Sequence, residues 1–133
     1  VEDRIWKTMG KNDHTESDAT MLLSKVIYTL ISFLQCCNKY PGTSQLSMQL
    51  FELIWPLRDS KYPELRRAVL HCTVYTINEL PSDGVLLLMS NNVAPIIEIS
   101  QWAEKTRNFD PDTECRRHAE VLQQMTKSFL NIF

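Results

Sequence analysis

The stretch "IWPLRDSKYPELRRAVL", from Ile54 to Leu70, decides the fold of this chain. Its first part continues an apolar helical run into Pro56. Proline has no N–H to donate, and its ring crowds the carbonyl four residues earlier, so the helix should kink or end there. Pro63 suits the first turn of a new helix, where a missing N–H is no loss. The stretch therefore predicts a helix, a short polar turn and a second helix.

The element "ELRR" at Glu64–Arg67 returns as "ECRR" at Glu114–Arg117, 50 residues later. Both follow a turn that contains Asp and Pro. Helix-turn-helix units that recur at such a period are typical of HEAT-like repeats, which stack because no unit can bury its apolar face alone. A turn carboxylate also accepts backbone N–H groups at a helix N-terminus, and we expect the arginine of the next repeat to reach it.

The first half of the chain predicts two more helices. A helical pattern follows Asp18, a plausible N-cap, and apolar residues cover most of its circumference, which indicates burial on more than one side. The turn "YPG" at 40–42 ends it. Thr43 or Ser44 then caps a helix with two apolar stripes, Leu46-Leu50-Leu53-Ile54-Leu57 and Met48-Phe51-Trp55.

The second half predicts a helix from Pro63 to Leu80 and helical segments within 83–107, as one kinked helix or two. Asp110 should cap the last helix, with Pro111 at its first position. That helix has a clean inward stripe, which consists of Cys115, Ala119, Leu122, Met125 and Phe129. No segment reads as a strand. We expect an all-α fold of five or six antiparallel helices in HEAT-like repeats, an α-solenoid fragment over 19–133 behind a mobile arm or linker at 1–18.

Composition excludes several classes of protein. The 133 residues suit one domain. A net charge of -2 and a pI of about 5.9 argue against a dedicated nucleic-acid binder, which usually carries a basic field. Three glycines are few for a phosphate-loop enzyme. Because the chain starts at Val1 without a signal-peptide pattern, we expect a piece of a longer protein.

The four cysteines and the most apolar run bear on the cellular compartment. Cys36, Cys37, Cys72 and Cys115 form no C-x-x-C pair and make a poor disulfide framework, so we interpret them as reduced intracellular thiols. The run from Met21 to Cys37 reads as too short and too polar to cross a membrane.

Two specific functional sites, a catalytic dyad and a zinc site, are alternatives to simple packing roles for the cysteines and histidines. Cys115 and His118 lie three apart on one helix face, so a catalytic dyad is conceivable, but no third orienting group is visible. A zinc site built on Cys36 and Cys37 lacks four ligands at tight spacing. We therefore predict no enzyme activity, no cofactor and no metal.

The remaining candidates are contact residues. Arg66-Arg67 and Arg116-Arg117 fit an inter-repeat polar ladder, and a basic stripe for nucleic acid is the alternative, weakened by flanking acids. The tryptophans are core fillers or partner anchors. The candidate inter-repeat or partner contacts are Trp55, Arg58, Arg66, Arg67, Trp102, Asp110, Asp112, Arg116 and Arg117.

The stretches "LFELIWPLR", "PELRRAVLHC", "AEK" and "DPDTECRRHA" resemble the C-terminal end of the telomere length regulation protein family. The likeness covers about Leu22 to Leu130 and is strongest in Leu50–Leu70 and Asp110–Ala119. The segment from Pro81 to Phe109 departs from the family pattern.

The resemblance implies a role that the residues alone do not. Members of that family are HEAT-like scaffolds. With two helical-repeat partner subunits and the ninety-kilodalton heat-shock chaperone, they stabilise and mature the phosphatidylinositol-kinase-related kinases of DNA-damage checkpoint, telomere and growth signalling. We accordingly expect a non-enzymatic scaffold, cytoplasmic and nuclear, with protein partners and no membrane. The alternative is a nucleic-acid-binding helical-repeat module.

Overall fold

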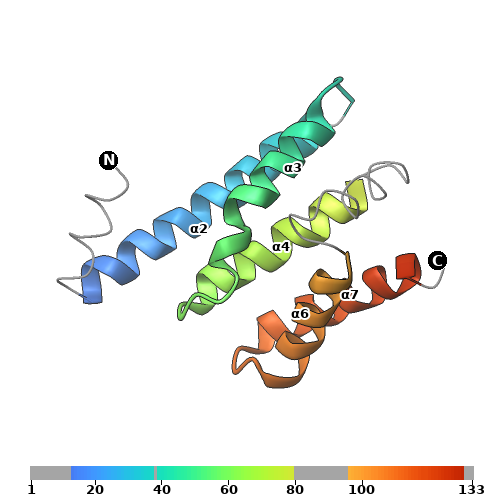
Figure 1. Cartoon of the computed structure of the whole chain (residues 1–133). Coiled ribbons are helices and arrows are strands. Elements are labelled where there is room, and N and C mark those ends of the chain that lie inside the picture. Colours follow the sequence, from blue (N-terminus) through green and yellow to red (C-terminus); the bar gives the residue numbers. More distant parts are fainter. Residues whose placement is uncertain (1–12, 38, 80–95, 131–133) are drawn as a thin grey trace.

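The computed structural model describes residues 13–37, 39–79 and 96–130 of the chain (Figure 1). Within these ranges the regular structure is all helical, without a strand, which confirms the predicted all-α class for them. The elements are α2 (Asp13–Cys36), α3 (Thr43–Ile54), the 3-10 turn η1 (Trp55–Leu57), α4 (Pro63–Glu79), α6 (Ile96–Phe109) and α7 (Thr113–Leu130).

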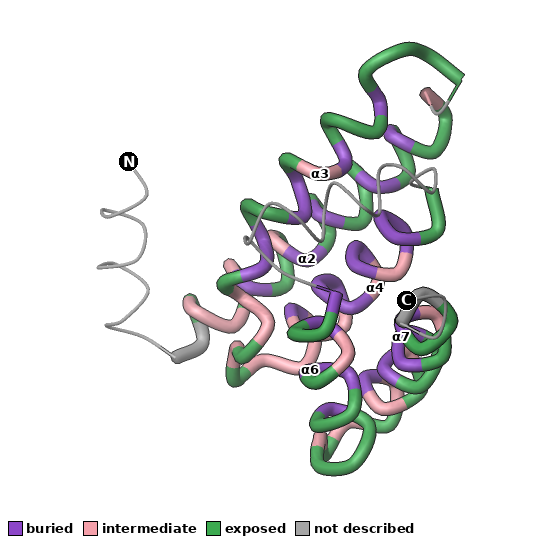
Figure 2. The backbone as a smooth tube through the Cα atoms, turned by 45° about the vertical axis from the view of Figure 1, so that its right-hand side comes forward, coloured by how far each residue is buried: buried purple, intermediate pink, exposed green. Residues whose placement is uncertain are grey.

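Helix α4 lies at the centre of the arrangement. It contacts α2 and α3 on one side and α7 on the other, and α6 pairs with α7 (Figure 1). Because α4 is covered from both sides, three consecutive residues in its middle, Ala68, Val69 and Leu70, have no exposed surface. Figure 2 shows buried backbone positions along this helix. The core therefore runs through α4 and joins the two halves of the molecule.

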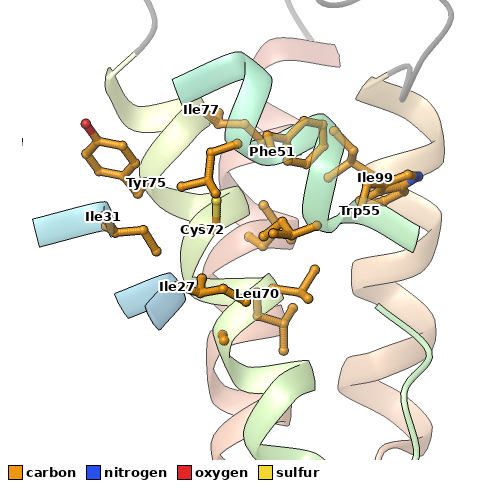
Figure 3. Packing of buried hydrophobic residues seen from close by; sticks show 14 of the residues in the cluster. Ile27, Ile31, Phe51, Trp55, Leu70, Cys72, Tyr75, Ile77 and Ile99 are labelled. Carbon is orange, nitrogen blue, oxygen red and sulfur yellow. The ribbon is translucent and has the colours of Figure 1, made fainter. Parts of the chain in front are cut away.

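The core side chains come from every described element. Phe51 and Trp55 reach down from α3 and η1, Ile27 and Ile31 come from α2, and Ile99 comes from α6 (Figure 3). All five are at most 6% exposed. Burial of large apolar side chains is the main favourable contribution to such a fold.

Pro56 ends helix α3, as predicted. The α-helix stops at Ile54, and Pro56 is the second residue of the tighter turn η1. Proline has no N–H to donate to the Glu52 carbonyl, so the α-helical ladder ends and the chain continues as a tighter turn that the Arg58 N–H closes on the Trp55 carbonyl at 3.2 Å. Helix α4 then begins at Pro63, also as predicted.

Helix α2 begins earlier than predicted. It starts at Asp13, so Asp18 lies inside the helix and is no N-cap. Residues 13–18, assigned to the mobile arm, are helical, and residues 1–12 lie outside the described part of the chain. Polar residues such as Glu16 and Ser17, which are half-buried here, interrupt the apolar pattern, so no apolar periodicity marks the start of the helix.

The prediction that this helix is buried on more than one side is wrong. Ile27, Ile31 and Leu34 face the core, but α3 and α4 cover only that side. The apolar residues of the other side are exposed, namely Met21, Leu22, Val26, Leu30 and Phe33. In α3, Leu46 and Leu53 are likewise exposed rather than part of a buried stripe.

The greater length of α2 bears on whether this helix could span a membrane. Over Thr15–Cys36 the helix is long and apolar enough to span a bilayer, with a mean hydropathy of 1.4. The expectation that this run is too short and too polar therefore fails. Core helices of soluble proteins and signal sequences pass the same test, so the finding is weak evidence by itself. One face of α2 packs on α4, which is what a core helix does.

The helix caps differ from the predicted ones by one or two residues. Gly42, in the left-handed conformation with φ 88°, precedes α3 as its N-cap. Thr43 is the first helical residue, and its hydroxyl donates to the Cys37 carbonyl at 2.6 Å and to the Tyr40 carbonyl at 2.9 Å. This residue therefore ties the helix to the preceding turn instead of capping it.

At the other cap, Asp112 and not Asp110 is the N-cap of α7. Its carboxylate accepts the Cys115 N–H at 2.9 Å, and Pro111 lies in the turn before the helix. The helix predicted at "GVLLLMS", and the question of one or two helices in 83–107, fall on residues 80–95, outside the described residues. The described helix of that region starts at Ile96.

Candidate functional site

The turn before α4 is closed by one serine. The Tyr62 N–H donates to the Ser60 hydroxyl oxygen at 3.2 Å, and the Arg66 guanidinium donates to the Ser60 carbonyl at 3.0 Å. The Ser60 side chain thus binds the main chain of Tyr62, and the Ser60 main chain binds Arg66 in the first two turns of α4. Such local bonds fix how the chain enters α4.

The turn before α7 repeats this pattern with Asp110 in place of the serine. The Asp112 N–H donates to the Asp110 carboxylate at 2.9 Å, and the Arg116 guanidinium donates to the Asp110 carbonyl at 2.7 Å. Each atom involved lies 50 residues after its counterpart in the first turn. The sequence similarity between "ELRR" and "ECRR" is therefore accompanied by the same local hydrogen bonds.

Two arginine–carboxylate pairs join the first unit, which is the turn at Ser60 with α4, to the second unit, which is the turn at Asp110 with α7. Arg66 donates from Nε and Nη2 to the two oxygens of Asp110 at 2.9 and 3.0 Å. Arg67 donates from Nε to Asp112 at 2.8 Å and forms a second bond to the same carboxylate. Bidentate pairs of this geometry are stronger and more directional than single contacts. They tie the start of α4 to the turn before α7.

These ion pairs are sheltered from solvent. The side chains of Arg66 and Asp110 are 14% and 7% exposed, and those of Arg67 and Asp112 are 35% and 14% exposed. The hydrogen bond from Arg67 holds the pKa of Asp112 well below its usual range, against the opposing effect of burial. Hydrogen bonds to the carboxylates raise the pKa of Arg66 and of Arg67. Both arginines and Asp112 are therefore charged at neutral pH.

The direction of the ladder is opposite to the predicted one. The turn carboxylates bind the arginines of the preceding helix, whereas the arginine that follows them, Arg116, binds the Asp110 carbonyl and the Thr113 hydroxyl. Arg117 forms a 3.3 Å pair with Glu114 and is 69% exposed. An exposed pair of this kind contributes little to stability. Arg66 and Arg67 therefore connect the units, and their counterparts in α7 do not.

The two candidate tryptophans meet across the same junction. Trp55 of η1 and Trp102 of α6 pack edge to face, with ring centroids 5.1 Å apart. Both are under 10% exposed. Arg58 lies over the Trp55 ring at 4.3 Å and donates to the Trp55 carbonyl at 3.0 Å. The tryptophans thus pack as core residues, and Arg58 covers one of them from the solvent side.

A small cleft lies beside these residues. Its lining consists of Arg58, Asp59, Arg66, Trp102, Lys105, Thr106, Phe109 and Asp110. Its volume is about 140 Å³. Neither Lys105 nor Phe109, which directly precedes the "DPD" turn, is among the contact residues predicted from the sequence. An aromatic residue at the end of a helix, next to that motif, was the available signal.

The Cys115–His118 pair does not have the environment of a nucleophile. Cys115 has no exposed surface, and burial raises the pKa of its thiol to about 12. Burial raises the pKa of Cys72 to about 12 as well. A cysteine nucleophile acts as the thiolate, which such values exclude at neutral pH. Across the described ranges no group of three or more His, Cys, Asp or Glu side chains could hold a metal ion.

No protein-family model, curated protein or solved structure matches the chain. The fold and the site define the class of this protein by the arrangement of its helices. The described part is an all-α protein in which a hairpin of α2 and α3 and a hairpin of α6 and α7 pack on either side of α4, with half-buried ion pairs at one end of the junction.

Proposed function

We propose that the chain is a non-enzymatic scaffold built from HEAT-like helical repeats, whose work is to bind other proteins. The observation that carries this proposal is the repeated turn, closed by Ser60 in one unit and by Asp110 in the next, with bidentate pairs between the units. Stacked units of this kind present long, continuous surfaces, and proteins built from them act by binding.

The chemistry of the polar residues supports binding over catalysis. The arginines of "ELRR" are engaged by carboxylates, and the thiols of Cys72 and Cys115 are buried and protonated at neutral pH. The same pairing weakens the nucleic-acid alternative, because Nε of Arg66 and Nε of Arg67 already donate hydrogen bonds to Asp110 and Asp112. A phosphate-binding stripe needs cations that are free to replace counterions.

The narrower proposal concerns partners. The resemblance of "DPDTECRRHA" and "PELRRAVLHC" to the telomere length regulation family is its only support. It names the first partners to test, which are two helical-repeat subunits, the ninety-kilodalton heat-shock chaperone and the phosphatidylinositol-kinase-related kinases. With it comes the proposal of a cytoplasmic and nuclear protein that takes part in maturing those kinases.

An affinity capture tests both levels. The purified chain, shown to be helical and folded by circular dichroism, is immobilised and exposed to cell lysate, and each protein recovered is then tested again in purified form. Recovery of the helical-repeat subunits or the kinases supports the narrower proposal. Reproducible binding of other purified proteins leaves only the scaffold role. A folded chain that binds no purified protein contradicts both.

A further inference from the structure

The cleft beside Trp102 is the right size for one side chain. Cavities that take small-molecule ligands usually measure about 300–1,000 Å³, whereas a cavity of about 150 Å³ accommodates a benzene-sized group. The cleft measures about 140 Å³. It therefore has room for one aromatic or large aliphatic side chain. Trp102 and Phe109 supply aromatic surface in its lining.

Phe109 is the most exposed large apolar side chain in the described part of the chain, at 79%. Its backbone is fixed, since the next residue, Asp110, is bound by both Arg66 and the Thr106 carbonyl, to which the Asp110 N–H donates at 3.0 Å. A rigidly placed, exposed aromatic ring beside a cleft gains free energy when a second apolar group covers it.

Two cations, Arg58 and Lys105, lie in the lining of the cleft. Neither Arg58 nor Lys105 forms an ion pair with any of the described residues. Arg66 and Asp110 also line the cleft, but they neutralise each other. Asp59 is the one other charge among the described residues of the lining, and these residues together carry a surplus of one positive charge. A ligand with a carboxylate next to an apolar side chain would complement this arrangement.

We infer that this cleft binds a short acidic peptide segment of a partner protein. One aromatic or large aliphatic side chain of the peptide enters between Trp102 and Phe109, and a flanking carboxylate binds Arg58 and Lys105. A nucleic-acid strand is the weaker fit, because a surplus of one positive charge matches a single carboxylate and not a run of backbone phosphates. The inference rests on the proposed function, since it assumes that the chain binds proteins.

Selection from a random peptide library on the immobilised, folded chain tests the inference. The expected result is enrichment of peptides with an aromatic or large aliphatic residue next to Asp or Glu. The best peptide is then measured by fluorescence polarisation against the chain and its variants. Lys105→Glu and Arg58→Glu should each weaken binding about tenfold, the loss typical of one charge-assisted contact. Phe109→Ala should weaken it by a similar factor.

Arg107→Glu is the matched control. Arg107 is an exposed residue of the same helix, lies outside the cleft lining and changes the net charge by the same amount. It should alter the dissociation constant less than twofold, and the melting temperature of each variant shows whether the fold is intact. Lys105 is itself exposed, so its variant keeps the test valid even where Arg58→Glu unfolds.

Three outcomes overturn the inference. They are selection of no peptide, selection of peptides without the acidic and apolar pair, and equal losses for Lys105→Glu and Arg107→Glu. Binding of single-stranded oligonucleotides in competition with the peptide would reassign the cleft. If a purified protein partner binds the chain and the Arg58→Glu, Lys105→Glu double variant equally well, the scaffold function stands and the cleft assignment is wrong. Cleft-dependent peptide binding with no protein partner would contradict the function alone.

Discussion

At the scale of single residues, the Arg66 side chain makes three hydrogen bonds at the junction. It binds the Ser60 carbonyl of its own turn and both oxygens of Asp110 in the next unit. One guanidinium therefore fixes the entry of α4 and the position of the turn before α7. Lysine could not replace it, because a single ammonium group cannot form the fork of parallel bonds.

Arg66→Met should destabilise the chain strongly. It leaves the Asp110 carboxylate, 7% exposed, without its cation, and removing one partner of a buried pair costs roughly 2–4 kcal/mol at such sites. Arg117→Met is the matched control, because that side chain is 69% exposed and its pair is worth less than about 0.5 kcal/mol. Urea denaturation followed by circular dichroism gives both free energies of unfolding.

The double variant Arg66→Met, Asp110→Asn separates charge from geometry. Asparagine keeps the oxygen that accepts the Asp112 N–H but removes the uncompensated charge, so part of the lost stability should return. Equal stability losses for Arg66→Met and Arg117→Met would show that the pair does not hold the units together.

His71 makes the stability depend on pH. Its ring lies 5.0 Å from that of Tyr28 and 6.3 Å from that of His118, so it sits where α2, α4 and α7 meet. Burial, and then the nearby His118, lower its pKa below the ordinary 6.5. The unfolded chain therefore binds the proton more tightly, and stability should fall as the pH drops from about 6.5 towards the lowered folded-state pKa.

Urea midpoints measured between pH 7.5 and pH 5 test this. His71→Phe should flatten the dependence in that window. The depressed pKa of Asp112 acts elsewhere, since its stability contribution is lost only below its unfolded value of 3.8. A wild-type midpoint that does not change between pH 7 and pH 5.5 would contradict the assignment to His71.

At the scale of elements, Gly42 decides how α2 turns into α3. Its φ of 88° is a left-handed conformation that costs an L-residue about 1–2 kcal/mol. Gly42→Ala should therefore lower the free energy of unfolding by about that amount. A Cβ at this position meets nothing within 4 Å, so any loss reflects the backbone alone. Gly42→Asn should lose less, because asparagine tolerates this conformation better.

Differential scanning calorimetry of the three proteins checks the order Gly, Asn, Ala in thermal stability. An alanine variant as stable as the wild type would mean that the turn relaxes to a negative φ without cost.

The helix boundaries show what the sequence could predict. Pro56 and Pro63 placed the end of α3 and the start of α4 correctly, since the missing N–H of proline acts locally and independently of the fold. The start of α2 was predicted too late, because the polar residues before Ala19 carry no periodic apolar signal. Which apolar face of α2 would be covered depends on the neighbouring elements and is absent from the local pattern.

The candidate site was predictable to the same degree. The repeated arginines and the turn acids stood out because residue type and spacing recur, and Arg66, Arg67, Asp110 and Asp112 do lie together. The predicted partners of the turn carboxylates were wrong, because the partners depend on whether the arginines of α4 or those of α7 face the turn. Lys105 belongs to the cleft only through the packing of α6 beside Trp55, which no sequence spacing encodes.

At the scale of the whole molecule, the exposed sides of the outer helices α2 and α7 differ. The exposed side of α7 is mainly polar, with Arg117, Glu120, Gln124 and Lys127. The exposed side of α2 is apolar instead. Substitutions at exposed positions of that side, such as Leu22, should change the free energy of unfolding little, because no described element packs on them.

The central position of α4 predicts that the molecule unfolds as one unit. Cys72 of α4 and Cys115 of α7 have no exposed surface, whereas Cys36 at the end of α2 is exposed. A thiol reagent should modify Cys36 at once, and Cys72 and Cys115 only when the structure opens. Since the core and the ion pairs join α4 to α7, both buried thiols should be modified at one common rate, read by mass spectrometry of the cysteine-containing peptides.

Arg66→Met tests the coupling. If the ion pairs bind the α6–α7 hairpin to the rest, the variant should expose Cys115 earlier than Cys72, because the hairpin can then open while α4 stays covered by α2 and α3. Faster but still equal modification of both thiols would mean that the apolar core alone makes unfolding cooperative. Unequal modification rates in the wild type would show that the α6–α7 hairpin opens independently of α4. The ion pairs would then contribute little to holding the two parts together.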